Sequence, residues 1–233
     1  MNPHDTTLKR PTAVPFPRTD SVSAHPPEAQ RVLRNTYGLL GLTLLFSAAV
    51  ATGTAALGLP HPGLAITLIG SFGLLFATAK LANSGWGLLA VFALTGFMGY
   101  TLGPVIGRVL SFPGGTQVVT MALAATALTF FALSACVLTT RRDFGFMGGF
   151  LFAGMVVALL AGIGAIAFEL PALSLAVSAI VVLLSAGLIL FETSRVVNGG
   201  ETNYVMATVG LYVAIFNLFS ALLSLFGYGG GDD

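Results

Sequence analysis

Seven apolar runs, each close to the thickness of a bilayer core, occupy most of this sequence. A helix needs roughly 20 apolar residues to cross the hydrocarbon region. The runs cover Tyr37–Leu57, Leu64–Ala79, Gly85–Gly107, Thr116–Leu138, Phe146–Phe168, Ala172–Glu192 and Tyr204–Phe226. Turn sequences such as GLPHPG, SFPGG and NGGETN separate them. A chain of 233 residues that is 55% hydrophobic cannot hide this much apolar surface in water. We therefore predict an all-α membrane protein with seven transmembrane helices.

The basic residues predict which side of the membrane each end occupies. With the N-terminus inside, nine of the ten Lys and Arg residues fall in inner segments and only Arg108 falls outside. Cytoplasmic loops carry such an excess of positive charge. We expect the N-terminus inside and the C-terminus outside. The chain then divides into a disordered cytoplasmic tail (residues 1–35), which is Pro-rich and poor in large apolar residues, a transmembrane domain (residues 36–227) and a short outer tail (residues 228–233).

The sequence lacks the residues that several kinds of chemistry require. The net charge of +1 gives no basic field for nucleic acid. All three histidines lie in the N-terminal tail or a loop, so no base is available for an intramembrane serine nucleophile. The last run has no lysine for a retinal Schiff base, and Cys136, which we expect to be a lone buried thiol, cannot hold a metal or haem. We expect no catalytic residues, no cofactor and no enzyme activity.

Four polar residues in or beside the runs are candidates for a pore or ion-interacting role: Glu192, Arg195, Lys80 and Asn217. Glu192 is the one acid that can lie inside the low-dielectric region, where it needs Arg195, Lys80 or water as a partner. The alternative is a carboxylate at the inner interface, paired to Arg195 three residues later. For Asn217, within the last run, we expect a hydrogen bond to a neighbouring helix.

The third run carries glycines at four-residue spacing, Gly99, Gly103 and Gly107, with Pro104 among them. Glycines on one helix face allow the backbone of a neighbouring helix to approach closely. Proline removes a helical hydrogen bond and bends the helix. Helix packing is the favoured interpretation, and a Gly-Pro gate is the alternative.

Four separated stretches resemble the Bax inhibitor-1 family, and within it the bacterial YccA branch. They are RVLRNTYGLLGLTLLFSA, GFMGYTLGPVIG, LTTRRDFGFMGG and the pair FETSRVVNGGETNY and ATVGLYVAIFNLFSALLSLFG. The resemblance runs from about Arg31 to Gly227. It implies a bundle in which the last helix is central and ringed by the other six.

The resemblance also implies two functions. Relatives of the YccA type are partners and slow substrates of the AAA+ protease FtsH in the bacterial inner membrane, and they restrain its proteolysis of membrane proteins. Channel-like relatives are pH-sensitive leaks for calcium or protons that use one acid on each of the last two helices. The first acid corresponds to Glu192, and a basic partner corresponds loosely to Lys80. The second acid falls on Ala214, which cannot ionise. The sequence therefore favours the FtsH partner over the channel.

Overall fold

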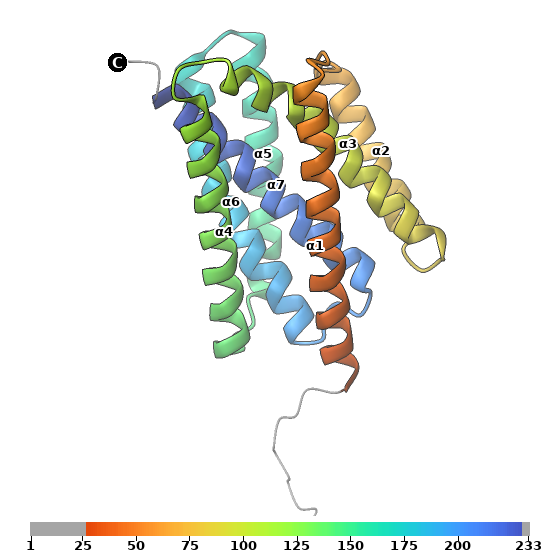
Figure 1. Ribbon diagram of the computed structural model, residues 1–233. Helices are drawn as coiled ribbons and strands as arrows, with labels where there is room; N and C mark the ends of the chain where they lie inside the picture. The colour runs from red at the N-terminus through yellow and green to blue at the C-terminus, as the bar shows by residue number, and fades with distance from the viewer. Residues whose placement is uncertain (1–26, 230–233) are drawn as a thin grey trace, which may run out of the picture.

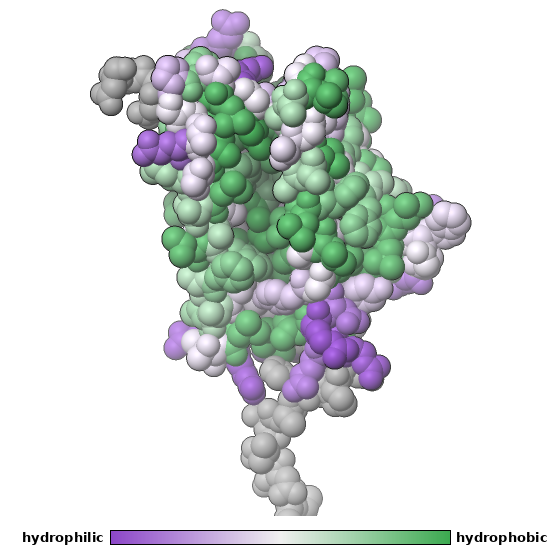
Figure 2. Space-filling view, in the orientation of Figure 1, coloured by the Kyte–Doolittle hydropathy of each residue, from purple (hydrophilic) through white to green (hydrophobic). Residues whose placement is uncertain are grey.

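The computed structural model describes residues 27–229 and is helical between its loops (Figure 1). Its elements are α1 (Pro27–Ala56), α2 (Leu64–Leu81), α3 (Trp86–Leu110), α4 (Gly115–Thr140), a short 3₁₀ helix η1 (Gly145–Met147), α5 (Gly148–Ala167), α6 (Pro171–Val197) and α7 (Tyr204–Gly229). Seven of these helices are long and apolar enough to cross a membrane, which confirms the predicted count in the described part of the chain. Figure 2 shows the corresponding surface, with hydrophobic residues over the middle of the visible face and hydrophilic residues gathered toward its ends.

Successive helices run in opposite directions and connect through short loops, so the loops gather at two ends of the bundle (Figure 1). The α2–α3, α4–α5 and α6–α7 loops lie at the end where α1 begins. The other three loops and the end of α7 lie at the opposite end. Those of the inner-side basic residues that the structure describes therefore fall at one end of the molecule: Arg31, Arg34, Lys80, Arg141, Arg142 and Arg195. Which end faces the cytoplasm stays a prediction.

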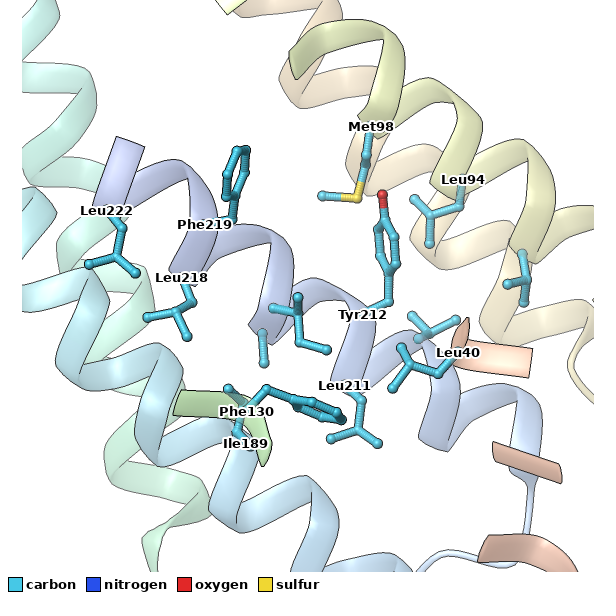
Figure 3. Close-up of a cluster of buried hydrophobic side chains, with 14 of the residues drawn as sticks. Leu40, Leu94, Met98, Phe130, Ile189, Leu211, Tyr212, Leu218, Phe219 and Leu222 are labelled. Carbon is cyan, nitrogen blue, oxygen red and sulfur yellow. The ribbon is translucent and has the colours of Figure 1, made fainter. Parts of the chain in front are cut away.

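Helix α7 is the most extensively buried of the seven spans. It packs against α1, α2, α3, α4 and α6. Figure 3 shows part of the resulting core, where Leu211, Tyr212 and Leu218 of α7 lie among side chains from neighbouring helices. Helix α5 has no contact with α7 and packs against α6 and η1 instead. The expectation that all six other helices surround the last one is therefore wrong for α5.

Helix α3 uses its glycine face to approach the backbone of α1. A Cβ atom added at Gly99 would lie 2.5 Å from the Ser47 carbonyl oxygen, and one at Gly103 would overlap Thr54 and lie 2.6 Å from the Ala51 carbonyl oxygen. At Gly107 the nearest atoms would be 3.7 Å away, which is ordinary contact. Two of the three glycines are thus required for the α1–α3 packing. The helix continues through Pro104, and the gate interpretation stays a prediction.

One boundary and one side chain differ from expectation. Helix α1 begins at Pro27, so residues 27–35, assigned above to the tail, are helical. The rest of that predicted tail, residues 1–26, lies outside the described residues, as do residues 230–233 of the outer tail. Cys136 is exposed rather than buried. In a membrane bundle an apolar run also has an outward face, so apolar sequence alone does not place a thiol in the core.

Candidate functional site

Three charged side chains form a cluster at the end of α6 and in the loop that follows it. Arg195 donates hydrogen bonds from Nη1 to Glu192 Oε2 at 3.4 Å and from Nη2 to Glu201 Oε2 at 2.8 Å. The two glutamate side chains are only 13% and 15% exposed, while that of Arg195 is 36% exposed. The guanidinium also lies 5.5 Å from the centre of the Phe191 ring, within range of a cation–π interaction. One cation is therefore shared by two carboxylates.

Gly210 of α7 makes room for the Glu192 carboxylate. A Cβ atom at position 210 would lie 2.6 Å from Glu192 Cδ and less than 3 Å from both carboxylate oxygens. Any side chain here would displace the carboxylate from its place between α6 and α7. Because this contact joins residues 18 positions apart on two helices, the sequence alone gave no signal for Gly210.

The cluster lines a partly open pocket of about 280 Å³ between α2, α6 and α7. Glu192, Arg195 and Glu201 supply its polar wall. Its apolar wall comes from three helices, through Leu75 of α2, Leu188 of α6 and Met206, Val209 and Val213 of α7. The pocket is amphipathic, and its polar groups carry a net charge of −1 when the two acids and the arginine are ionised.

Ser194, beside the charged cluster, ties the α4–α5 loop to α6. Its Oγ accepts a hydrogen bond from the Phe144 backbone N–H at 2.9 Å and lies 3.3 Å from the Arg142 carbonyl oxygen, to which it donates. The Asn198 side chain donates to Ser194 Oγ at 3.2 Å and to the Arg142 carbonyl at 3.4 Å. The segment Arg141–Asp143, whose two arginines we predict to lie on the inner side, is thus held by side chains at the end of α6.

Asn203 begins α7 and connects it to the α2–α3 loop. Its Oδ1 accepts from the backbone N–H groups of Val205 and Met206, at 2.9 and 3.3 Å, which is an N-cap. Its Nδ2 donates to the Ala82 carbonyl at 3.1 Å and to Asn83 Oδ1 at 2.7 Å. By residue type the preceding Thr202 would serve as well, since Asn and Thr are both good caps. Only the position of the α2–α3 loop favours Asn203.

Lys80 and Asn217 lie outside the charged cluster. Lys80 is exposed near the end of α2, and among residues 27–229 its ammonium forms no ion pair with Glu192. Arg195 is the basic partner of Glu192 instead. Asn217 is half-buried, and in the same part of the chain its amide has no hydrogen-bond partner. The interhelical hydrogen bond of Asn217 stays a prediction.

Tyr212 links α7 to two other helices through its hydroxyl group. Its hydroxyl lies 2.6 Å from Ser47 Oγ of α1 and donates at 3.3 Å to the Thr95 carbonyl oxygen of α3. The side chain is 1% exposed, and Figure 3 shows it pointing toward α3 beside Met98. This polar contact fixes α7 against two other helices.

The chain was compared with known families and proteins. The sequence profile of the family described as "Inhibitor of apoptosis-promoting Bax1" matches residues 29–231. An Escherichia coli protein named "Modulator of FtsH protease YccA" is 53% identical over 92% of this chain and 95% of its own length. An uncharacterised protein of Pseudomonas aeruginosa is 53% identical over 92% of this chain and 96% of its own, and a Vibrio cholerae membrane protein is 40% identical over 94% and 98%. The chain belongs to the Bax inhibitor-1 family.

Membership in the Bax inhibitor-1 family fits the seven spanning helices. A second E. coli relative, 53% identical over 92% of this chain, bears the name "Inner membrane protein YccA". With seven helices of spanning length in the described residues, the chain is a multi-pass protein of the bacterial inner membrane.

The acid pair that the family resemblance implies is reduced to one member at this site. Ala214, at the position of the second acid, is 0% exposed. It lies four residues, about one helical turn, after Gly210, so it shares the helix face that receives Glu192. Glu192 pairs with Arg195 instead, and the same guanidinium also pairs with a second carboxylate, that of Glu201. The site is therefore an arginine held between two acids.

Proposed function

We propose that this chain is a regulatory partner of the membrane protease FtsH. In this proposal it binds the protease within the inner membrane, is degraded slowly, and so restrains the degradation of other membrane proteins. The observation that carries the proposal is the 53% identity, over 92% of the chain, to a protein named as a modulator of FtsH.

The fold supports a physical route to restraint by a slow substrate. A protease that extracts this chain must move polar loops through hydrocarbon, where unsatisfied backbone groups are costly. The inner end also resists separation, because Ser194 and Asn203 bind two other loops to the α6–α7 region. An engaged protease is expected to remain occupied for a long time. With the N-terminus inside, the segment before α1 lies on the inner face, which is the orientation that the basic loops favour.

Co-reconstitution tests the proposal directly. Purified chain and FtsH are placed in one membrane with a different membrane substrate, and the half-life of that substrate is measured as the amount of chain increases. We expect the half-life to lengthen with the ratio of chain to protease. Membranes without the chain serve as the control. If the chain neither co-purifies with FtsH nor slows degradation of the other substrate, the proposal is wrong.

A pH-sensitive calcium or proton leak is the second candidate, and the Glu192 pocket is the observation that favours it. Ala214→Asp would place a second acid one turn from Gly210, and two neighbouring carboxylates resist ionising together. We expect this variant, in liposomes, to pass more calcium than the parent and to do so with a dependence on pH. Glu192→Gln is expected to abolish the gain. Equal flux through variant and parent from acid to neutral pH would remove both residues from any pore.

A further inference from the structure

The Glu192 carboxylate has hydrogen-bonding capacity that the protein does not use. An ionised carboxylate offers about four acceptor positions. Among residues 27–229, Glu192 accepts one hydrogen bond, from Arg195 at the long distance of 3.4 Å. Glu201 by contrast uses both oxygens, at 2.8 Å to Arg195 and 3.0 Å to the Asn203 backbone N–H. A carboxylate so far removed from water is costly without strong donors, so Glu192 has room for a donor from a ligand.

The pocket in front of this carboxylate lies where the spans end and the loops begin. Its polar wall comes from the last two turns of α6 and the α6–α7 loop, and its apolar wall continues to Leu75 of α2. Helix α2 is the least covered of the seven spans in the described residues. Its exposed side chains include Phe72 and Phe76, at 55% and 72%. The pocket thus connects a polar site at the level expected for lipid headgroups with the apolar surface of α2, which would face the acyl chains.

The net charge of the site and the unused acceptor positions of Glu192 determine which kind of ligand fits. Two carboxylates and one guanidinium leave a net negative charge, which attracts a cation. Calcium and magnesium ions take six or more ligands, mainly oxygen atoms. The described residues contain no metal-holding cluster of acids, and the Arg195 guanidinium already binds both carboxylates. A singly charged group with N–H donors on a carbon stem matches the carboxylate and the apolar wall together.

We propose that this pocket binds a phospholipid whose headgroup ends in a primary ammonium. The ammonium donates to the unused Glu192 oxygen, the phosphate faces the outward side of Arg195, and the acyl chains lie along α2. A trimethylated ammonium has no N–H donor, so the site prefers ethanolamine over choline headgroups. This assignment does not depend on FtsH and concerns the chain alone.

Competitive lipid retention tests the assignment. The full-length protein is purified in detergent, supplied with equal amounts of ethanolamine and choline phospholipids with the same acyl chains, and analysed by native mass spectrometry. We expect the ethanolamine lipid to be retained about tenfold over the choline lipid, the scale of one hydrogen bond to a charged group. Glu192→Gln is expected to remove the preference. Glu169→Gln serves as the matched control, because Glu169 is an exposed acid at the opposite end of the bundle and should keep it.

Gly210→Ala provides a second variant in case Glu192→Gln fails to fold. Its added Cβ displaces only the flexible end of Glu192, and we expect it to weaken the preference as well. Equal retention of the two lipids by the parent would overturn the assignment. So would a preference that survives both variants, or tighter binding of calcium or of a lysine-containing peptide than of the ethanolamine lipid.

Discussion

At the scale of single residues, two tyrosines with buried hydroxyl groups have opposite surroundings. The Tyr212 hydroxyl lies 2.6 Å from Ser47 Oγ and 3.3 Å from the Thr95 carbonyl oxygen. The buried Tyr37 hydroxyl, within the part of the chain described here, has no hydrogen-bond partner. Removing one partner of a buried hydrogen bond leaves the other unsatisfied, whereas removing an unpaired hydroxyl leaves nothing behind. The same chemical change should therefore have different effects at the two sites.

We expect Tyr212→Phe to lower the free energy of unfolding by about 1 kcal/mol, because hydrogen bonds between membrane helices contribute roughly that much. Tyr37→Phe, the matched control, should be neutral or slightly stabilising. Thermal melts of both variants in the same detergent measure the difference. Equal destabilisation by the two substitutions would mean that the Ser47–Tyr212 contact contributes nothing of its own.

The two acids that share Arg195 should also differ. Glu201→Gln weakens the 2.8 Å hydrogen bond from Arg195 and the hydrogen bond from the Asn203 backbone N–H. Glu192→Gln weakens only the 3.4 Å hydrogen bond from Arg195. Because Arg195 is 36% exposed, solvent screens both pairs. We expect a loss of about 0.5 kcal/mol or less for Glu192→Gln and about 1 kcal/mol for Glu201→Gln. Chemical unfolding in detergent compares them, and the reverse order would contradict the geometry.

At the scale of helices, the α1–α3 packing depends on how close two backbones come. Gly103 faces Ala51 and Thr54 at a distance that leaves no room for a methyl group, whereas the surroundings of Gly107 accept one at 3.7 Å. Both glycines are helical and lie one turn apart on the same face. They differ in the space in front of them, and Gly103 also directly precedes Pro104.

Gly103→Ala is expected to destabilise the protein by about 1–3 kcal/mol, the cost of overpacking a tight interface. Gly107→Ala should be neutral or stabilise by a few tenths of a kcal/mol, since alanine restricts the unfolded chain. Melting temperatures of the two variants decide the matter. A Gly103→Ala protein as stable as Gly107→Ala would show that α3 can move away from α1 at no cost.

The sequence alone predicts the spanning helices and contacts within one helix, but not contacts between helices. Hydropathy located all seven spans because burial in lipid depends on local composition. It placed the start of α1 at Tyr37 instead of Pro27, because polar residues that extend a helix beyond the apolar region carry no hydropathy signal. The Glu192–Arg195 pair was predictable from its spacing within one helix. Gly210 and Asn203 were not, because their partners are brought together by the packing of separate helices.

At the scale of the whole molecule, hydrogen bonds and an ion pair join the three loops at the end where α1 begins. Ser194 holds the α4–α5 loop, Asn203 holds the α2–α3 loop, and Arg195 holds Glu201 of the α6–α7 loop. All three residues belong to the region where α6 passes into α7. Pulling on any one loop therefore acts on the whole of this end, which we predict to be the inner one. An ATP-driven protease working from this side would need to break these contacts together before the first helix leaves the membrane.

The segment that precedes α1 is the part that such a protease would meet first. A chain of 26 residues reaches at most about 90 Å, and it joins α1 at the end that carries the three linked loops. Deleting residues 2–26 leaves every described helix in place, because α1 begins at Pro27. We expect this variant to have a longer half-life in the presence of FtsH and to restrain the protease less. It lacks the segment that the protease would engage, while its helical bundle is intact.

Pulse–chase measurements with FtsH in the same membrane give the half-lives. A variant that lacks residues 230–233 is the matched control, since it shortens the chain at the opposite end of the bundle, beyond Gly229 of α7. Its half-life should equal that of the full-length chain, because in the predicted orientation the C-terminus lies on the outer side, out of reach of a protease on the inner face. If the N-terminal deletion disappears as fast as the full-length chain, extraction does not begin at α1. The protease would then have to engage an internal loop, and the three-loop cluster that Ser194, Asn203 and Arg195 hold together would be the first structure it has to open.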